Sequence, residues 1–338
     1  MSTNQQRMET LDVLRGLASL AVCWFHFTQA TSGFLPDGWL KATGRPGWLG
    51  VEVFFVISGF VIPLSLHRAG YQWRNFGAFM LKRLVRLDPP YLAAIGIILV
   101  LGYLHGRQSQ FSAGQVLTHL GYVNVWVGYK WLNPVFWTLA IEFQYYLLIG
   151  LLFPLVASPR WWVRAAALVC FGALGFVCRA DVYLFHYSFL FLLGIATFHL
   201  RSGLANRRVY LALVAVMGVG TWLTMGRSYA LVGVGTALII AFAEIRRGRV
   251  LRFLGEISYS LYLLHAPIGM GIIALCMGHV STMPEKVAVL GAALAASIAA
   301  AALLHRWVEK PAQQWSSGIR FQRKSGQDLP VEIQARAA

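Results

Sequence analysis

The chain has 338 residues, of which 57% are hydrophobic, 14% aromatic and 12% charged, and its mean hydropathy is +0.59. Soluble domains carry about 25% charged residues, so this chain lacks the polar surface that a water-exposed fold needs. The composition therefore excludes a soluble globular protein. A net charge of +16 would suggest nucleic-acid binding in a soluble chain, and the placement of the basic residues tests that interpretation.

Ten stretches are long and apolar enough to cross a bilayer as helices, which takes about 20 mostly apolar residues. They lie near residues 11–31, 49–67, 90–105, 136–157, 162–178, 183–200, 209–226, 228–244, 255–278 and 286–306. We therefore predict an all-α integral membrane protein with about ten transmembrane helices.

The basic residues test this count, because cytoplasmic loops hold an excess of Lys and Arg. With a cytoplasmic N-terminus, Arg15 falls inside the first span and most of the 29 Lys and Arg residues fall on the inner side. The outer side receives Lys41, Arg45, Arg107, Lys130, Arg179, Arg227 and Lys286. This asymmetry predicts that both termini are cytoplasmic, and it explains the positive charge without a nucleic-acid partner.

The spans divide the chain into a transmembrane domain over 1–310 and a polar cytoplasmic tail over 311–338, which its composition predicts to be disordered. The longest outer connection, 106–135, is rich in Trp, Tyr and Gly. Irregular backbone is not tolerated against lipid, so a re-entrant or lid element is the interpretation for this segment.

The cysteines predict neither a disulfide framework nor a metal site. All of them lie within predicted spans and none forms a C-x-x-C pair, so they are expected to be small packing residues. They are Cys23, Cys170, Cys178 and Cys276.

Ionisable residues inside spans cost a few kcal/mol each and are therefore candidates for function. In the first span Arg15 and His26 are eleven residues apart, which places them on one stripe of a helix about 16 Å apart along its axis. If the spans are centred in the bilayer, His26 and Glu142 lie about 7 and 6 Å to the outer side of its midplane. Matching depth predicts that Glu142 pairs with His26 and orients it as a general base.

A basic cluster stands at the inner mouth of the third span. Arg83 and Arg86 are three residues apart and share one helical face. Planar guanidinium groups suit phosphates, so the pair is a candidate anchor for a phosphorylated cytosolic cofactor. The alternative is that these arginines only fix the orientation of the helix in the membrane.

Six sequence blocks occur in an order that resembles the bacterial acyltransferase 3 family. The blocks are R-G-L-A with His26, F-F-V-I-S-G-F with Ser58, R-x-x-R-x-x-P-x-Y from Arg83 to Tyr91, F-W-T-L-x-x-E ending at Glu142, G-E-I-S-Y-S-L-Y-L-L-H-A-P with Ser258, Tyr259 and His265, and W-V-E-K-P from Trp307. Members are integral membrane acyltransferases that modify hydroxyl groups of envelope glycans, exopolysaccharides and lipid-linked sugars.

The resemblance assigns roles to these positions. It implies that His26, Glu142 and Arg15 are catalytic, with His26 acting either as the general base or as a nucleophile that carries the acyl group transiently. It implies that Arg83, Arg86 and Tyr91, with Arg15, bind the acyl-CoA donor, usually acetyl-CoA. Oxyanion or acceptor-site roles are suggested for Ser258, Tyr259, His265 and Ser58.

The expected activity is transfer of an acyl group, expected to be acetyl, from cytosolic acyl-CoA to a hydroxyl of a sugar-containing acceptor at the bacterial inner membrane. The alternatives are an acyltransferase for a small-molecule acceptor, such as an antibiotic or glycolipid, and a proton-coupled transporter that uses His26, Glu142 and Arg15. Some relatives carry a periplasmic esterase-like domain, so a separate periplasmic transferase is a further expected partner.

Overall fold

The computed structural model describes residues 3–31, 33–106, 110–245 and 248–321, and every regular element within them is helical. The first half contains α1 Thr3–Phe25, η1 His26–Ala30, α2 Trp39–Gly44, η2 Arg45–Leu49, α3 Gly50–Arg68, η3 Trp73–Asn75, α4 Phe76–Leu104, α5 Ala113–His119, η5 Val125–Val127 and α6 Trp137–Val156. The second half contains α7 Trp161–Val177, η6 Leu184–Tyr187, α8 Ser188–Arg201, α9 Arg207–Met225, α10 Arg227–Phe242, α11 Arg249–Glu256, α12 Ser258–Leu264, η7 His265–Met270, α13 Gly271–Cys276, α14 Met283–Leu304, η8 His305–Glu309 and α15 Lys310–Gly318.

The prediction of an all-α membrane protein is confirmed. Seven helical segments of the described chain are long and apolar enough to cross a membrane, and α7 and α10 are shorter apolar helices. The first predicted span corresponds to α1, which carries Asp12 and Arg15 among its apolar residues. Each of the ten predicted stretches thus lies on a helix.

Close contacts between helices form where glycines meet. A Cβ atom on Gly59 of α3 would lie 2.2 Å from the Phe191 carbonyl oxygen of α8, and one on Gly194 of α8 would lie 2.2 Å from the Val56 carbonyl oxygen. Small residues let backbones approach in this way, which is the usual basis of helix packing in membranes. The α3–α8 pair is therefore fixed at backbone contact in the centre of the bundle.

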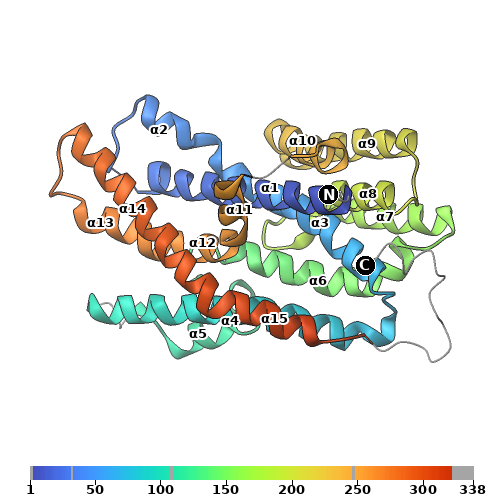
Figure 1. Ribbon diagram of the computed structural model, residues 1–338, viewed down its shortest axis with the longest axis horizontal. Helices are drawn as coiled ribbons and strands as arrows, with labels where there is room; N and C mark the ends of the chain where they lie inside the picture. Colours follow the sequence, from blue (N-terminus) through green and yellow to red (C-terminus); the bar gives the residue numbers. More distant parts are fainter. Residues whose placement is uncertain (1–2, 32, 107–109, 246–247, 322–338) are drawn as a thin grey trace.

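The helices are staggered along the long axis of the molecule. A Cβ atom on Gly50 would lie 2.5 Å from the Ala18 carbonyl oxygen, so α3 begins beside the middle of α1. The segment α2–η2 runs back along the second half of α1, where Trp24 Nε1 donates to Thr43 Oγ1 at 2.9 Å. Figure 1 shows the ends of α1, α4, α13 and α14 extending further to the left than α6 to α10.

The 106–135 connection packs against the protein through Tyr122. The Tyr122 ring stacks on Tyr91 at 5.1 Å and on Phe143 at 5.0 Å, and its hydroxyl donates to Asp88 Oδ1 at 2.8 Å. The segment predicted as a re-entrant or lid element therefore packs between α4 and α6.

Part of the predicted cytoplasmic tail is helical. Residues 310–318 form α15, which packs along α4, so the predicted disordered tail is wrong for this part. The pattern was misread because the helix is polar on its exposed face and buries only small side chains, Ala312 and Ser316. Residues 322–338 of the predicted tail lie outside the described residues.

Candidate functional site

A cavity of about 510 Å³ lies among α1, α3, α4, α6, α12 and the C-terminal helices, and we call it the arginine cavity. Seven of the predicted site residues line it: Arg15, Ser58, Arg83, Arg86, Glu142, Ser258 and Tyr259. Residues far apart in the sequence thus converge on one space of the size that holds a small-molecule ligand.

The arginines form one wall of this cavity. Arg83 and Arg86 share a face of α4, as their spacing predicted, and both lie within electrostatic range of Arg15, while Arg83 is also within range of Glu142. The Arg83 guanidinium lies over the rings of Phe79 and Tyr146, with centroids 5.5 and 5.6 Å away. Such cation–π contacts hold the group in place without neutralising its charge.

Arg83 retains a free hydrogen-bond donor although its side chain is only 9% exposed. Its Nε is buried and makes no hydrogen bond within the described chain. Buried polar groups normally have a partner, and an unpaired one calls for an explanation such as an absent ligand. The donor therefore points to an acceptor supplied from outside the protein, and phosphate oxygens are the acceptors that guanidinium groups suit best.

The predicted pairing of Glu142 with His26 is wrong. Glu142 Oε1 instead accepts a hydrogen bond from Ser58 Oγ at 2.6 Å. Ser58 lies eight residues beyond Gly50, or about 12 Å further along α3 toward the start of α1. Since Gly50 lies beside Ala18, Glu142 is level with the first half of α1 and shares the cavity with Arg15. The depth estimate failed because it centred every span at one height, whereas the helices are staggered.

His26 faces a second histidine. His26 Nδ1 lies 3.2 Å from His265 Nε2, and the ring centroids are 5.0 Å apart. The Nδ1 atoms of both rings also approach carbonyl oxygens of their own helices, Val22 at 2.9 Å for His26 and Leu261 at 3.1 Å for His265. The family block had indicated His265 as a site residue, but its partnership with His26 was not foreseen.

The carbonyl contacts assign the tautomers of this histidine pair, because a carbonyl can only accept a hydrogen bond. Both Nδ1 atoms then carry the proton. His265 Nε2 is left with a lone pair that accepts from the His26 Nδ1–H group, which is shared with Val22. The consequence is that His26 Nε2 keeps a free lone pair, the form that a general base requires.

The backbone departs from the regular α-helix at both members of the histidine pair. Three π-helical segments occur in the described chain, η1, η7 and η8, and they begin at His26, His265 and His305. Insertions of this kind are rare and are frequent at functional sites. Two of these histidines form the pair, and the third lines the arginine cavity. Sequence patterns give no signal for such turns, so this feature was missed.

Tyr262 lies between the arginine cavity and the histidine pair. Tyr262 lines the arginine cavity, and its ring lies 5.9 Å from the His265 ring. Its hydroxyl is 2.8 Å from Thr138 Oγ1, another residue of the cavity wall. The cavity therefore reaches the neighbourhood of the histidine pair along α12.

Three predicted site residues have structural contacts instead. Tyr91 is 1% exposed, lies in the aromatic core and does not line the arginine cavity. The hydroxyl groups of Ser258 and Tyr259 donate to the carbonyl oxygens of Gly255 at 2.8 Å and Leu87 at 3.0 Å. Because their protons are already used, these two groups are not available as oxyanion donors in this arrangement.

Glu309 is a buried, hydrogen-bonded acid in the wall of the arginine cavity. Glu309 is 4% exposed and accepts from Ser260 Oγ at 2.6 Å and from Gln313 Nε2 at 2.9 Å. His305 Nδ1 lies 3.2 Å from the same carboxylate. The W-V-E-K-P block was the signal for this network, and its role is to join η8 and α15 to α12.

The sequence of the chain is similar to those of known acyl-transferring proteins. BcsY of Komagataeibacter xylinus, described as a membrane-bound transacylase, is 29% identical over 78% of this chain and 73% of its own length. The O-acetyltransferase OatA of Staphylococcus aureus is 26% identical over 76% of this chain, and the match spans half of OatA.

No solved structure matches the chain significantly. A family model described as an acyltransferase domain matches residues 8–305, which contain the arginine cavity wall from Arg15 to His305 and the histidine pair. The chain therefore belongs to the acyltransferase 3 family.

Proposed function

We propose that the protein transfers an acetyl group from cytosolic acetyl-CoA to a hydroxyl of a sugar-containing acceptor at the bacterial inner membrane. The observation that carries the proposal is the unpartnered, buried Arg83 Nε in a wall of three guanidinium groups. This donor suits a phosphorylated ligand, and membership of an acyltransferase family supports an acyl donor as that ligand. The name of OatA, an O-acetyltransferase, supports acetyl as the group transferred.

The donor would lie with its phosphates against Arg15, Arg83 and Arg86. Arg15 and His26 lie on the same helix, eleven residues and about 16 Å apart. An extended pantetheine arm that starts at the arginines and passes Tyr262 would therefore bring its thioester to the histidine pair. In this arrangement a charged site binds the donor and a separate neutral site performs the chemistry.

The transfer step uses the free lone pair of His26. Nε2 takes the proton of the acceptor hydroxyl while the hydroxyl oxygen attacks the thioester carbonyl carbon. The C–S bond then breaks, an ester forms, and CoA leaves as a thiolate that recovers the proton from His26. His265 accepts the hydrogen bond from His26 Nδ1–H throughout, which keeps the ring oriented and favours the imidazolium that forms transiently.

The transporter alternative loses its basis in this structure. It required His26, Glu142 and Arg15 to form one proton pathway, whereas Glu142 is bonded to Ser58 and His26 to His265. An acyltransferase with a small-molecule acceptor uses the same donor site and the same histidine pair, and it differs from the proposal in the acceptor only. A separate periplasmic transferase that receives the acetyl group is a further variant of the proposal.

The experiment incubates the purified protein in nanodiscs with radiolabelled acetyl-CoA and bacterial envelope glycans. Label should appear in ester linkage on the glycan with wild type and not with His26→Ala. Label that accumulates inside proteoliposomes without any ester product would support transport and contradict the proposal.

A further inference from the structure

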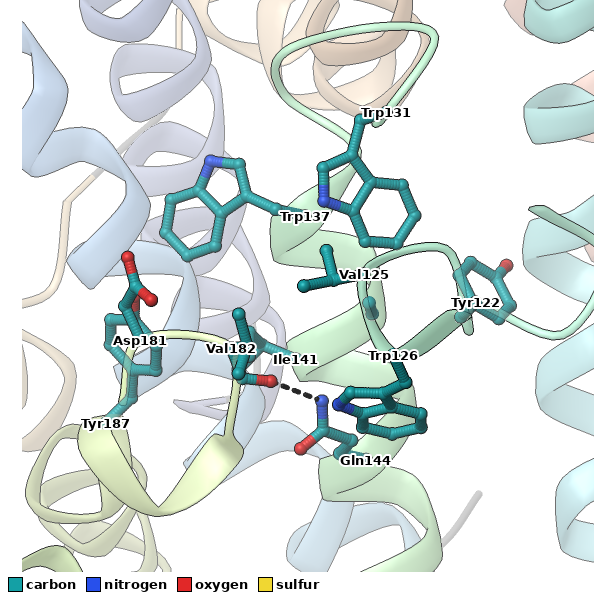
Figure 2. A pocket seen from close by; sticks show the side chains of 11 residues that line it. Tyr122, Val125, Trp126, Trp131, Trp137, Ile141, Gln144, Asp181, Val182 and Tyr187 are labelled. Atoms are coloured by element: carbon teal, nitrogen blue, oxygen red, sulfur yellow. Dashed lines mark hydrogen bonds between the residues drawn. The ribbon is translucent and has the colours of Figure 1, made fainter. Parts of the chain in front are cut away.

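A second cavity of about 280 Å³ lies on the other side of α6, and we call it the aromatic cavity. Its walls include Trp126 and Trp131 from the 106–135 connection, Trp137 from α6, and Asp181 and Tyr187 from the connection into α8. Figure 2 shows the Trp137 ring extending toward the side that carries Asp181 and Tyr187, with Trp131 and Trp126 on the opposite side. Both connections are on the outer side in the predicted topology.

The two cavities use opposite faces of one helix. Thr138, Leu139 and Glu142 line the arginine cavity, whereas Trp137 and Ile141 line the aromatic cavity. The Trp137 ring also lies 6.4 Å from Phe55, which belongs to the arginine cavity. The beginning of α6 is therefore the partition between the proposed donor site and the aromatic cavity.

Several polar groups in the aromatic cavity are free. The indole N–H groups of Trp126, Trp131 and Trp137 make no hydrogen bond with any described residue, and the Asp181 carboxylate likewise forms no hydrogen bond or ion pair within the described chain. Gln144, in contrast, is fully engaged, because its amide donates to Val182 O at 3.0 Å and accepts from Leu184 N at 2.9 Å.

These groups match the chemistry of a sugar ring. The face of an aromatic ring is electronegative and attracts the C–H groups on the face of a pyranose, while indole N–H groups and a carboxylate suit its hydroxyl groups. We propose that the aromatic cavity binds a hexopyranose unit of the acceptor, with stacking on the tryptophans and a hydrogen bond from a sugar hydroxyl to Asp181. This inference rests on the proposed function and adds the acceptor site to it.

Two other interpretations of the tryptophans fit less well. Aromatic residues of a membrane belt lie at the lipid interface around a bundle, whereas these three line one cavity together with Asp181 and Gln144. A site for an acyl chain would be lined by aliphatic groups, whereas this cavity is lined by a carboxylate and by indole N–H groups that an acyl chain cannot hydrogen-bond. A sugar ring can stack on the faces of the tryptophans and can also form hydrogen bonds with the indole N–H groups and the carboxylate.

One wall of the aromatic cavity is hydrogen-bonded, through the next residues of the chain, to the helix that carries His265. Trp131 lines its end, and two residues further along the chain Asn133 Nδ2 donates to the Leu263 carbonyl oxygen at 2.9 Å. Leu263 precedes His265 by two residues on α12. The cavity wall at Trp131 is therefore linked through Asn133 to the part of α12 that precedes His265.

The test measures sugar binding directly. Saturation-transfer NMR on wild type in nanodiscs uses the methyl pyranosides of glucose, galactose, mannose and N-acetylglucosamine, with cyclohexylmethanol as an apolar alcohol of similar size. At least one pyranoside should bind, and the double variant Trp126→Ala/Asp181→Asn should weaken that binding at least tenfold. Both residues are exposed, with Trp126 at 51%, so the variant should fold. Trp222→Ala, at an exposed tryptophan of α9, should bind as wild type does.

The result that overturns the acceptor site is binding of no pyranoside in the panel, binding that survives in the double variant, or equal binding of cyclohexylmethanol. Acetyl-CoA affinity is measured on the same samples and should be equal in wild type and the double variant. If wild type binds a pyranoside but no acetyl-CoA, the proposed function fails while the sugar site stands, so the two failures are distinguishable.

Discussion

The arginine cavity and the histidine pair are built from different chemistry. The cavity gathers three guanidinium groups and leaves a buried donor without an acceptor, whereas the histidine pair is neutral and is held by carbonyl oxygens and by itself. Arg15 and His26 place the two centres about 16 Å apart on one helix. Under the proposed function, this difference separates the binding of a charged donor from the proton transfer, and each prediction below tests this separation.

The largest expected effect is that of His26→Ala. Removing a general base lowers kcat by about 10²- to 10⁴-fold, and because His26 lies outside the arginine cavity the dissociation constant of acetyl-CoA should stay at the wild-type value. Transfer of radiolabel gives kcat, and equilibrium dialysis gives the dissociation constant. If His26→Ala weakens acetyl-CoA binding as well as lowering kcat, donor binding and proton transfer do not occur at separate places in the protein.

The converse change is Arg83→Gln. Hydrogen bonds to charged groups contribute about 1.5–3 kcal/mol, so acetyl-CoA should bind roughly 10- to 100-fold more weakly, while kcat at saturating donor changes little. Lys82→Gln is the matched control, because it removes a neighbouring positive charge that does not line the cavity. If Arg83→Gln and Lys82→Gln bind acetyl-CoA equally well, Arg83 does not bind the donor and serves only to orient α4 in the membrane.

His265 is expected to act as a positioning residue. Without the acceptor at His265 Nε2, the His26 ring loses its second hydrogen bond, and we expect His265→Ala to lower kcat on the order of tenfold with the KM for acetyl-CoA unchanged. His265→Gln keeps an acceptor and should recover part of kcat. If thermal stability is intact but Gln and Ala behave alike, the hydrogen bond has no role in orienting His26.

A smaller effect is expected for Glu142→Gln. The amide oxygen can still accept from Ser58, and the change removes a negative charge beside three guanidinium groups. Donor binding should become tighter by roughly 2- to 5-fold, as expected for a partly solvated charge pair, with kcat close to wild type. A loss of kcat comparable to that of His26→Ala would restore the role of Glu142 as the partner of His26.

The smallest effect concerns His119 in the 106–135 connection, which belongs to neither the arginine cavity nor the histidine pair. His119 Nδ1 donates to Gln115 O at 2.7 Å and Nε2 accepts from Leu132 N at 3.1 Å, so the ring is needed in its neutral form. Burial lowers the pKa of His119 below its ordinary value. Below about pH 6.5 the unfolded chain takes up this proton while the folded one does not, so stability falls as the pH is lowered. The melting temperature should drop more between pH 7.5 and 5.5 in wild type than in His119→Gln, and equal drops would contradict this assignment.

Much of the fold and of the donor site could be predicted from the sequence. Apolar length identified the helices, and helical spacing placed Arg83 and Arg86 on one face beside the space that Arg15 enters. The sequence could not predict the stagger of the helices, because it depends on backbone contacts such as Gly50 against Ala18. For the same reason Glu142 was assigned to the wrong partner.

Other features depended on contacts that no local pattern encodes. The pairing of His26 with His265 joins residues 239 positions apart. The π-helical turns at both histidines leave no trace in the hydrophobic pattern. The aromatic residues of the 106–135 connection were visible in the sequence, but only the folded chain shows that they meet the 181–187 segment and enclose a cavity.

The central claim is that a donor held by the arginines presents its acyl carbon to His26. Bromoacetyl-CoA tests it directly, since it carries an alkylating carbon next to the position of the thioester. Mass spectrometry of the treated wild-type protein should find the carboxymethyl-type adduct on His26, blocked by excess CoA and lost in Arg83→Gln/Arg86→Gln. Protein that binds the reagent but carries its adduct elsewhere, or on His26 regardless of the two arginines, would contradict the account.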